Sequence, residues 1–368
     1  MSDRTGLDGR PTIVRAVIRA AFVFQNPRRE LLEDVRAGRE PDTALVGVNH
    51  LAAFGVDARV QDPLLGRQDY SGAVGRLAWS AREVPLPWAI READVVFTPL
   101  ANLFPLVARL RPSLPVVVVN YGLNVIYDRS SRARRRLLAA SLRSARAVVC
   151  LGESQRLGMI ARAGLEPASV HTLLLGADVD WFAPQEVRVT EPYVLTVGKD
   201  LARDLETFSA AVRDLDVRVE IVAHPRNLAG VALPQNARVH NFIPATELRD
   251  LYAGAACVVV PQQPDEYPYG SDGGGLTALC EAMAMGKPIV ATERTVLRDY
   301  LDADELVPPR DPAALRSAIE GVLTDPRVAD ERGARSRRRA EERHSTQHFA
   351  EQLAPILRAA AAGNLEAR

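Results

Sequence analysis

The chain has 368 residues with 46 basic and 46 acidic side chains, so its overall charge gives no support for a strongly one-signed partner such as nucleic acid. A hydrophobic content of 47% and a charged content of 25% exclude a disordered or fibrous protein, and this length favours two domains over one. Only two of the basic residues are lysines, Lys199 and Lys287.

Near the N-terminus the chain is polar and charged. The apolar stretch that follows is interrupted by Arg15 and Arg19, so we expect neither a signal peptide nor a membrane span. Short Val/Ile/Leu-rich runs then alternate with longer amphipathic stretches, which predicts parallel strands covered by helices. The first series of expected strands is 17–24, 94–98, 115–119, 146–151 and 170–174.

A second series of strands follows a connection at 176–192 that is rich in turn formers and charges. The expected strands are 193–197, 217–223, 238–241, 257–260 and 288–292, and the stretch 344–358 has the spacing of a terminal helix. We therefore predict an α/β protein of two doubly wound, Rossmann-like domains, 1–186 and 187–343. Residues 344–368 form a C-terminal helix and tail that can return to the first domain.

Three cysteines, Cys150, Cys257 and Cys280, lie inside apolar runs without CxxC spacing. This pattern predicts buried thiols in a reducing compartment, hence a cytoplasmic protein, and indicates neither a disulfide framework nor a zinc site.

The segment 257–292 carries the strongest chemical signal: a strand, a glycine-rich loop, a helix and a Gly-Lys-Pro turn into another strand. Gly273, Gly274 and Gly275 allow the backbone to approach a ligand closely. Leu276 and Thr277 then open a helix whose free amides and dipole favour an anion such as a diphosphate. Glu281 lies one helical turn after Thr277, on the same face. A glycine-rich loop before a buried helix, with Glu281 as a solvated or capping acid, carries about equal weight on spacing alone.

The run GLTALCEAMAMGKPIVAT closely resembles the donor-site helix of GT-B fold glycosyltransferases, specifically the retaining family 4 type, also called glycosyltransferase group 1. LLLGADVDWFAP, YVLTVGKDLARDLETF, NFIPATELRDLYAGAACVVVPQ and LVPPRDPAALRSAIEGVL resemble further segments of that family in the same order, which together cover about residues 170–350. The resemblance implies two facing Rossmann-like domains with a central cleft. The C-terminal domain would bind a nucleotide-sugar, and the N-terminal domain would hold a glycan, lipid-linked or small-molecule acceptor.

The resemblance also assigns roles to residues. Glu281 matches the family's glutamate that holds the ribose hydroxyls, and Lys199, after Gly198, matches the basic residue that neutralises the leaving phosphate. Arg203 stands near the place of a second basic residue, although RDLETF could equally be a helix start capped by Asp204. Gly275, Leu276 and Thr277 match the positions whose amides meet the diphosphate. Breaking the anomeric bond leaves negative charge on a nucleoside diphosphate. Fixed cations and helix amides can stabilise this charge as it develops, so such a site needs no metal and no cofactor beyond the donor substrate.

The chain departs from the family where the first glutamate of the motif should stand, because that position is Gly273. Asp272, Asp265 and Glu266 lie in the same loop, and we prefer Asp272 as the acid that reaches the donor sugar. Solvated loop acids remain the alternative for all three.

On the acceptor side, Asn26 and Arg28 follow the first strand, and Asn120, Tyr121 and Asn124 follow the strand 115–119. Parallel sheets bind ligands beyond the carboxyl ends of their strands, which makes these five residues acceptor-side candidates. A turn role for Asn120 and Gly122 is about as well supported. His50 is expected to be a satisfied helical histidine.

Residues 129–146 carry seven arginines and no acid on an expected helix with interspersed leucines. Such a helix can make peripheral contact with anionic lipid at the inner face of the membrane, and a solvated basic helix is the alternative. The cluster at 332–343 is partly balanced by acids and is expected on a surface helix. Neither cluster has the aromatic interleaving of a nucleic-acid site.

Arginine richness is typical of a bacterial source with high GC content. The leading function is retaining, metal-independent glycosyl transfer. An epimerase or phosphorylase on the same fold, or a non-catalytic sugar-nucleotide-binding protein, remains open.

Overall fold

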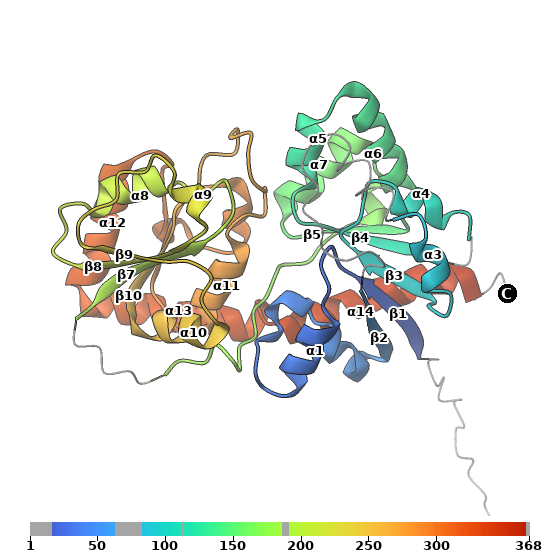
Figure 1. Cartoon of the computed structure of the whole chain (residues 1–368), viewed down its shortest axis with the longest axis horizontal. Helices are drawn as coiled ribbons and strands as arrows, with labels where there is room; N and C mark the ends of the chain where they lie inside the picture. The colour runs from blue at the N-terminus through green and yellow to red at the C-terminus, as the bar shows by residue number, and fades with distance from the viewer. Residues whose placement is uncertain (1–16, 63–82, 112–113, 186–190, 366–368) are drawn as a thin grey trace, which may run out of the picture.

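The computed structural model describes residues 17–62, 83–111, 114–185 and 191–365. They form two six-stranded parallel sheets with flanking helices, seen side by side in Figure 1. The predicted α/β class with two Rossmann-like domains is confirmed.

In the first sheet the strand order is β2-β1-β3-β4-β5-β6. Strands β3 and β4 are buried along their whole length, as expected for continuous apolar runs covered on both faces. The strands of this domain are β1 (Ile18–Val23), β2 (Val56–Gln61), β3 (Val95–Thr98), β4 (Val116–Asn120), β5 (Ala147–Cys150) and β6 (Val170–Thr172). Its helices are α1 (Arg29–Arg36), η1 (Asp42–Leu45), η2 (Val48–Phe54), α3 (Leu86–Ala89), α4 (Phe104–Ala108), α5 (Leu123–Arg129), α6 (Arg132–Ser144), α7 (Glu153–Ala163) and η3 (Pro167–Ser169).

For the second sheet the order is β12-β11-β10-β7-β8-β9, so the direction of winding reverses between β7 and β10. Ligands of open parallel sheets bind at such a switch point. The strands are β7 (Tyr193–Gly198), β8 (Arg218–Ala223), β9 (Ala237–His240), β10 (Ala255–Val260), β11 (Ile289–Thr292) and β12 (Leu306–Val307). The helices are α8 (Leu205–Val212), α9 (Pro225–Leu228), α10 (Ala245–Gly254), α11 (Leu276–Ala284), η4 (Thr295–Asp299), η5 (Ala303–Glu305), α12 (Pro312–Thr324), α13 (Pro326–Arg343) and α14 (Thr346–Leu365).

Two strands and one helix differ from the sequence-based expectation. Strand β2 was not expected because its alternating charged residues lack an apolar run, and it pairs only with β1 at the sheet edge. Strand β12 has only two residues. The prediction of a single basic helix over 129–146 is wrong, because α5 ends at Arg129 and α6 begins at Arg132. Ser131 caps α6 by accepting a hydrogen bond from the Arg134 amide.

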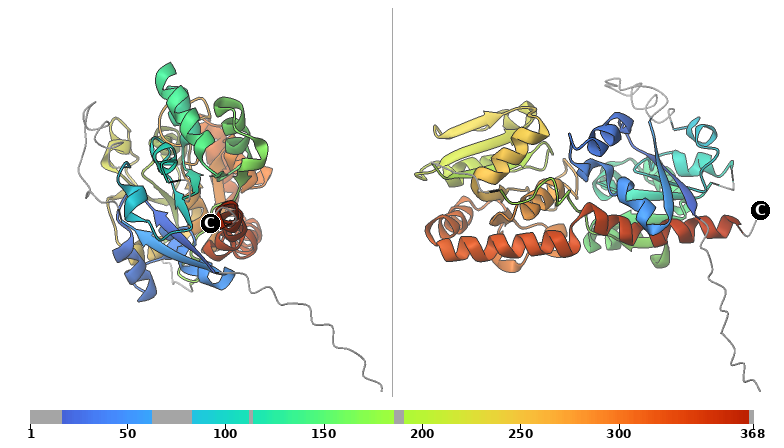
Figure 2. Two further views of the ribbon diagram at one scale, coloured as in Figure 1. Left: turned by 90° about the vertical axis from the view of Figure 1, so that its right-hand side faces the viewer. Right: turned by 90° about the horizontal axis from the view of Figure 1, so that it is seen from below.

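Two chain crossings join the domains. Helices α13 and α14 run along one side of both domains (Figure 2), and α14 packs against η2, β1, β3 and β4 of the first domain. Where the first crossing meets the second, the Ala177 amide donates to His344 O at 2.8 Å and the Thr346 amide donates to Ala177 O at 3.1 Å. Gly176 is required there, because a β-carbon would lie 2.3 Å from the Ser345 carbonyl carbon.

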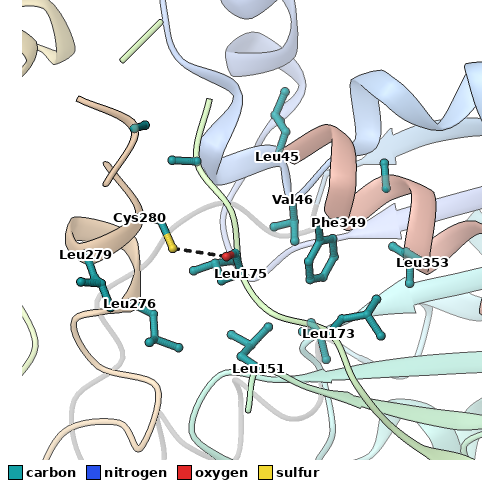
Figure 3. Packing of buried hydrophobic residues seen from close by; sticks show 14 of the residues in the cluster. Leu45, Val46, Leu151, Leu173, Leu175, Leu276, Leu279, Cys280, Phe349 and Leu353 are labelled. Carbon is teal, nitrogen blue, oxygen red and sulfur yellow. Dashed lines mark hydrogen bonds between the residues drawn. The ribbon is translucent and has the colours of Figure 1, made fainter. Parts of the chain in front are cut away.

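One hydrophobic core is continuous across this junction. Figure 3 shows Leu175 of the first crossing between α11 of the second domain on one side and, on the other, Leu151 of the first domain and Phe349 of α14. The Cys280 thiol donates to Leu175 O at 3.2 Å. All three cysteines are buried and free, as predicted. The buried side of α11, the helix that carries the candidate donor site, is therefore packed at the junction of the two domains.

Candidate donor site at the sheet switch point

The glycine-rich loop enters α11 through a tight turn. Gly275 is the residue before the helix and has a φ of 91°, a left-handed conformation that favours glycine. A β-carbon there would also lie 2.1 Å from the Gln262 side-chain nitrogen, which donates to Gly274 O at 2.7 Å. Thr277 is exposed in the first turn, where backbone amides have no helical partner. The helix therefore presents its amides beyond the ends of β7 and β10.

Glu281 lies one turn further along α11 and is buried, with 7% of its surface exposed. The Tyr252 hydroxyl donates to its carboxylate at 3.0 Å. Burial raises the pKa of Glu281 from 4.5 to about 7, while the Tyr252 hydrogen bond and the nearby Lys199 ammonium act in the opposite direction. Glu281 is thus a buried hydrogen-bond acceptor whose burial-raised pKa is partly lowered by the charge of Lys199. The alternative prediction that Glu281 is a solvated acid is wrong.

Lys199 follows β7 directly and is exposed. In the described ranges no carboxylate forms an ion pair with its ammonium, so the charge is available to a ligand. The other lysine, Lys287, donates to Ala253 O at 2.5 Å, and burial lowers the pKa of its ammonium. The two lysines therefore have different surroundings, one open at the switch point and one engaged by the backbone.

Arg203 is buried beneath the same edge of the sheet and donates to Val197 O. Its Nε and Nη1 atoms are buried and have no partner among the described residues. Burial lowers the pKa of Arg203 to about 10, so the guanidinium keeps its charge at neutral pH. Gly198 makes room for it, because a β-carbon at that position would lie 2.1 Å from Arg203 Nε. Asp204, the alternative considered for this segment, also caps α8 by accepting from the Thr207 amide at 3.0 Å.

Asp200 fastens the turn after β7 to the glycine-rich loop, a role that sequence reasoning missed. Its carboxylate accepts from the Ala202 amide at 2.8 Å and from the Ser271 amide at 3.3 Å. A β-carbon on Gly270 or Gly274 would lie 2.3 or 2.7 Å from the same carboxylate oxygen. The position of Asp200 directly after Lys199 was the available signal.

The acids of the loop point in different directions. Asp265 accepts from Arg294 Nε at 3.3 Å and from the Thr295 amide at 3.0 Å, so its carboxylate is engaged within the second domain. Glu266 is exposed. Asp272 instead accepts from the Asn124 side chain of the first domain at 2.9 Å.

The preferred acid, Asp272, therefore lies at the contact between the domains. Burial raises the pKa of its carboxyl group, and the hydrogen bond from Asn124 opposes that shift. The second carboxylate oxygen, Oδ1, is buried and forms no hydrogen bond of normal geometry, although the Gln155 side chain and the amide of Asp272 itself also act to lower the pKa of this carboxyl group. Beside it, Ser271 Oγ donates to Tyr121 O, which also joins the loop to the end of β4.

Five acceptor-side candidates divide into structural and open groups. The Asn120 side chain accepts from the Gly122 amide at 3.0 Å and the Leu123 amide at 2.6 Å, which is the turn role left open above. Asn124 is engaged by Asp272, and Asn26 is exposed. Arg28 and Tyr121 form the remaining pair.

Arg28 and Tyr121 influence each other electrostatically. Burial lowers the pKa of Arg28 and raises that of Tyr121, and each partly opposes the other's shift. The Arg28 backbone is held by Asp62, which accepts from its amide at 2.7 Å, and Arg28 Nε is buried without a partner in the described part of the chain. His50 is satisfied, because Asp42 lies 2.6 Å from its Nε2.

One cluster of three acidic residues in the described part of the chain has the spacing of metal ligands. Asp302, Asp304 and Glu305 place oxygens within 4.8 Å of one another. Arg335 and Arg339 already form ion pairs with them at 2.7 and 2.6 Å. These three acids belong to η5 and its N-cap, not to the loop that precedes α11.

Comparison with known proteins gives matches to the second domain and to the fold. Residues 192–325 match the family model described as Glycosyl transferases group 1. A curated relative, the MMP alpha-(1->4)-mannosyltransferase of Mycolicibacterium hassiacum, is 26% identical over 208 residues, which are 52% of this chain. The match spans 49% of that relative, about half its length.

Solved structures match over nearly the whole chain. Sucrose-phosphate synthase from Thermosynechococcus elongatus has a TM-score of 0.71 at 20% identity, covering 94% of this chain and 100% of that one. HepE from Anabaena, solved in complex with UDP and glucose, has a TM-score of 0.68 at 14% identity, covering 93% and 100%. The predicted fold of two Rossmann-like domains in the GT-B arrangement is confirmed by this likeness.

Proposed function

We propose that this chain, which has a GT-B fold and carries a glycosyl transferases group 1 domain at residues 192–325, moves a sugar from a nucleotide-sugar to an acceptor, retaining the anomeric configuration and using no metal. The observation that carries the proposal is the meeting of Lys199, Glu281 and the start of α11 at the switch point between β7 and β10. HepE was solved with UDP and glucose, which supports a nucleotide-sugar as the donor.

Cleavage of the anomeric bond leaves negative charge on the departing nucleoside diphosphate. The free Lys199 ammonium and the amides at the start of α11 can stabilise that charge as it develops. Arg203 supplies a second cation, with two buried nitrogen atoms that no described residue engages. These fixed charges do the work that a divalent metal performs in other enzymes.

Glu281 is suited to hold the ribose of the donor. Its buried carboxylate can accept hydrogen bonds from two neighbouring hydroxyls, and such bonds favour the ionised form. The free Oδ1 of Asp272 is a candidate acceptor for a hydroxyl of the transferred sugar, because it is buried at the point where the loop meets the first domain.

For retention, the acceptor hydroxyl attacks on the face from which the diphosphate leaves, and the leaving phosphate oxygen accepts the hydroxyl proton. The new glycosidic bond forms as the bond to the diphosphate breaks, so no side-chain nucleophile is needed. Arg28, Tyr121 and Asn26, at the carboxyl edge of the first sheet, are the proposed contacts of a glycan, glycolipid or small-molecule acceptor.

We also propose a cytoplasmic location with peripheral contact to the inner face of a membrane through α6. None of the helices in the described ranges is both long and apolar enough to cross a membrane. In those ranges no acid pairs with the seven arginines of 129–146, and Leu137 is 44% exposed among them. By contrast, the second arginine cluster, on α13, is paired with acids of η5.

Vesicle flotation tests this contact. We expect replacement of Arg134 and Arg136 by Gln to reduce binding to vesicles that contain phosphatidylglycerol. The matched replacement of Arg213 and Arg238, exposed on the second domain, should leave binding unchanged. Equal flotation of both variants and the parent would refute the contact.

The enzymatic proposal is tested first by thermal shift with UDP-, GDP-, ADP- and TDP-sugars. We expect one of them to stabilise the protein, and release of free nucleoside diphosphate only when an acceptor is added. A donor that binds but is never cleaved would indicate a non-catalytic binding protein, and a changed sugar without any acceptor would indicate an epimerase. The anomeric configuration of the product tests retention, and activity in EDTA tests metal independence.

A further inference from the structure

Phe242 combines two properties that rarely occur together. Its φ is 52°, in the left-handed region, and its surface is 79% exposed, more than any other large apolar side chain in the described ranges. A bulky residue in this conformation is a strained outlier, and glycine or asparagine would fit at lower cost. Because so little of the ring is covered by the protein, burial does not explain why phenylalanine stands there.

The register of the second sheet shows what Phe242 lies beside. Gly198 of β7 pairs with Ala223 of β8, and Val222 of β8 pairs with His240 of β9. Extended beyond these pairs, the same register sets Lys199 opposite His224 and His224 opposite Phe242, so the three residues lie in a row along the carboxyl edge. Neighbouring strands are about 4.8 Å apart, so the row places Phe242 on the order of 10 Å from Lys199.

His224 connects the two ends of this row. Its ring lies 5.5 Å from that of Phe242, centre to centre, at an interplanar angle of 83°. Its Nδ1 accepts from the Arg226 amide at 3.1 Å, and Arg226 Nη2 donates to Lys199 O at 3.0 Å. With Nδ1 accepting, the neutral imidazole carries its proton on Nε2, which leaves that atom as a donor.

We propose that Phe242 and His224 form the platform for the base of the donor nucleotide, with the base stacked on the Phe242 ring and a base carbonyl within reach of His224 Nε2–H. This inference rests on the proposed function, because it takes the diphosphate to sit at Lys199 and the start of α11. The base of a nucleoside diphosphate anchored there can reach along the strand ends toward β8 and β9, because Phe242 lies on the order of 10 Å from Lys199. The strained backbone at Phe242 holds the ring out toward that ligand.

The test compares ligands with and without a base. Binding of UDP, GDP and ADP is measured by calorimetry, and inorganic diphosphate is measured as the base-free probe. Because stacking of a base on an aromatic ring is lost in Phe242→Ala, we expect this variant to bind the nucleotide roughly 5- to 100-fold more weakly than the parent. Its affinity for inorganic diphosphate should be unchanged. Phe242→Trp should restore nucleotide affinity, and Leu157→Ala, which removes an exposed apolar side chain of α7, should change neither ligand.

A second substitution separates recognition from structure. Phe242→Gly removes the ring and also relieves the left-handed strain, so we expect the midpoint of thermal unfolding to stay the same or rise while nucleotide affinity falls. Equal nucleotide affinity of Phe242→Ala and the parent would overturn the platform, and so would a parallel loss of inorganic diphosphate binding. Failure of the parent to bind any nucleoside diphosphate would instead refute the proposed function.

Discussion

Glu281 provides the sharpest test of the donor site, because its burial links stability to pH. In the unfolded chain its carboxyl group titrates near 4.5, and burial on α11 raises the pKa to about 7. Between these two values the folded protein retains a proton that the unfolded chain has released. Stability therefore falls as the pH rises from about 4.5 to about 7, and the penalty is constant above that range.

The magnitude follows from the size of the shift. Each pKa unit corresponds to about 1.4 kcal/mol, so a rise from 4.5 to about 7 costs the folded state about 3 kcal/mol once Glu281 is ionised. Glu281→Gln keeps the shape of the side chain and an oxygen that can accept from Tyr252, but it does not ionise. We expect this variant to match the parent near pH 4.5 and to exceed its free energy of unfolding by about 3 kcal/mol above pH 7.

Urea denaturation of both proteins from pH 5 to pH 8.5 measures this difference. Glu206→Gln is the matched control, because Glu206 is exposed on α8 and the same chemical change there should give no pH-dependent gain. In the same variant, donor affinity should fall roughly 10- to 100-fold, since hydrogen bonds to a charged group are worth about 1.5–3 kcal/mol. A difference in stability that does not vary with pH would refute the reasoning.

Three further predictions concern neighbouring residues. Lys199→Gln should lower kcat by roughly 100- to 1,000-fold while the donor Kd changes less, and an equal loss in both would contradict a role in the transition state. Gly198→Ala should displace Arg203, lower stability by about 1–3 kcal/mol and reduce turnover, as measured by thermal unfolding and product release; an unchanged variant would mean that the guanidinium is not packed on the glycine. In a double-mutant cycle, Asp272→Ala and Asn124→Ala should couple by about 0.5–3 kcal/mol in unfolding free energy, and additive effects would show that their contact is not formed in solution.

Most of the fold could be predicted because its signals are local. The buried strands are runs such as VVVV in β4, whose apolar character is visible without any partner. Strand β2 carries Asp57 and Arg59 among its few apolar residues, so only its pairing with β1 defines it as a strand. The break between α5 and α6 depends on one capping serine inside a strongly helical composition.

The candidate donor-site residues could be selected for the same reason, since Gly275, Thr277 and Glu281 lie within one short segment. The parts that were missed depend on contacts between distant segments. Asp272 and Asn124 are 148 positions apart, and Asp200 is 71 positions from the Ser271 amide that it holds. No periodicity or spacing connects such pairs, so these contacts follow only from the packed structure.

The glycine at position 273 and the contact between the domains explain each other. A β-carbon on Gly273 would lie 3.1 Å from the Gln155 side-chain nitrogen and 3.3 Å from Tyr121 O, both in the first domain. A glutamate side chain would start from a β-carbon in tight contact with both groups, so we expect Gly273→Glu to shift Gln155 or the loop and to weaken the hydrogen bond from Asn124 to Asp272. Glycine at position 273 therefore favours the close contact of this loop with the first domain, and the adjacent Asp272 is the acid that takes part in that contact.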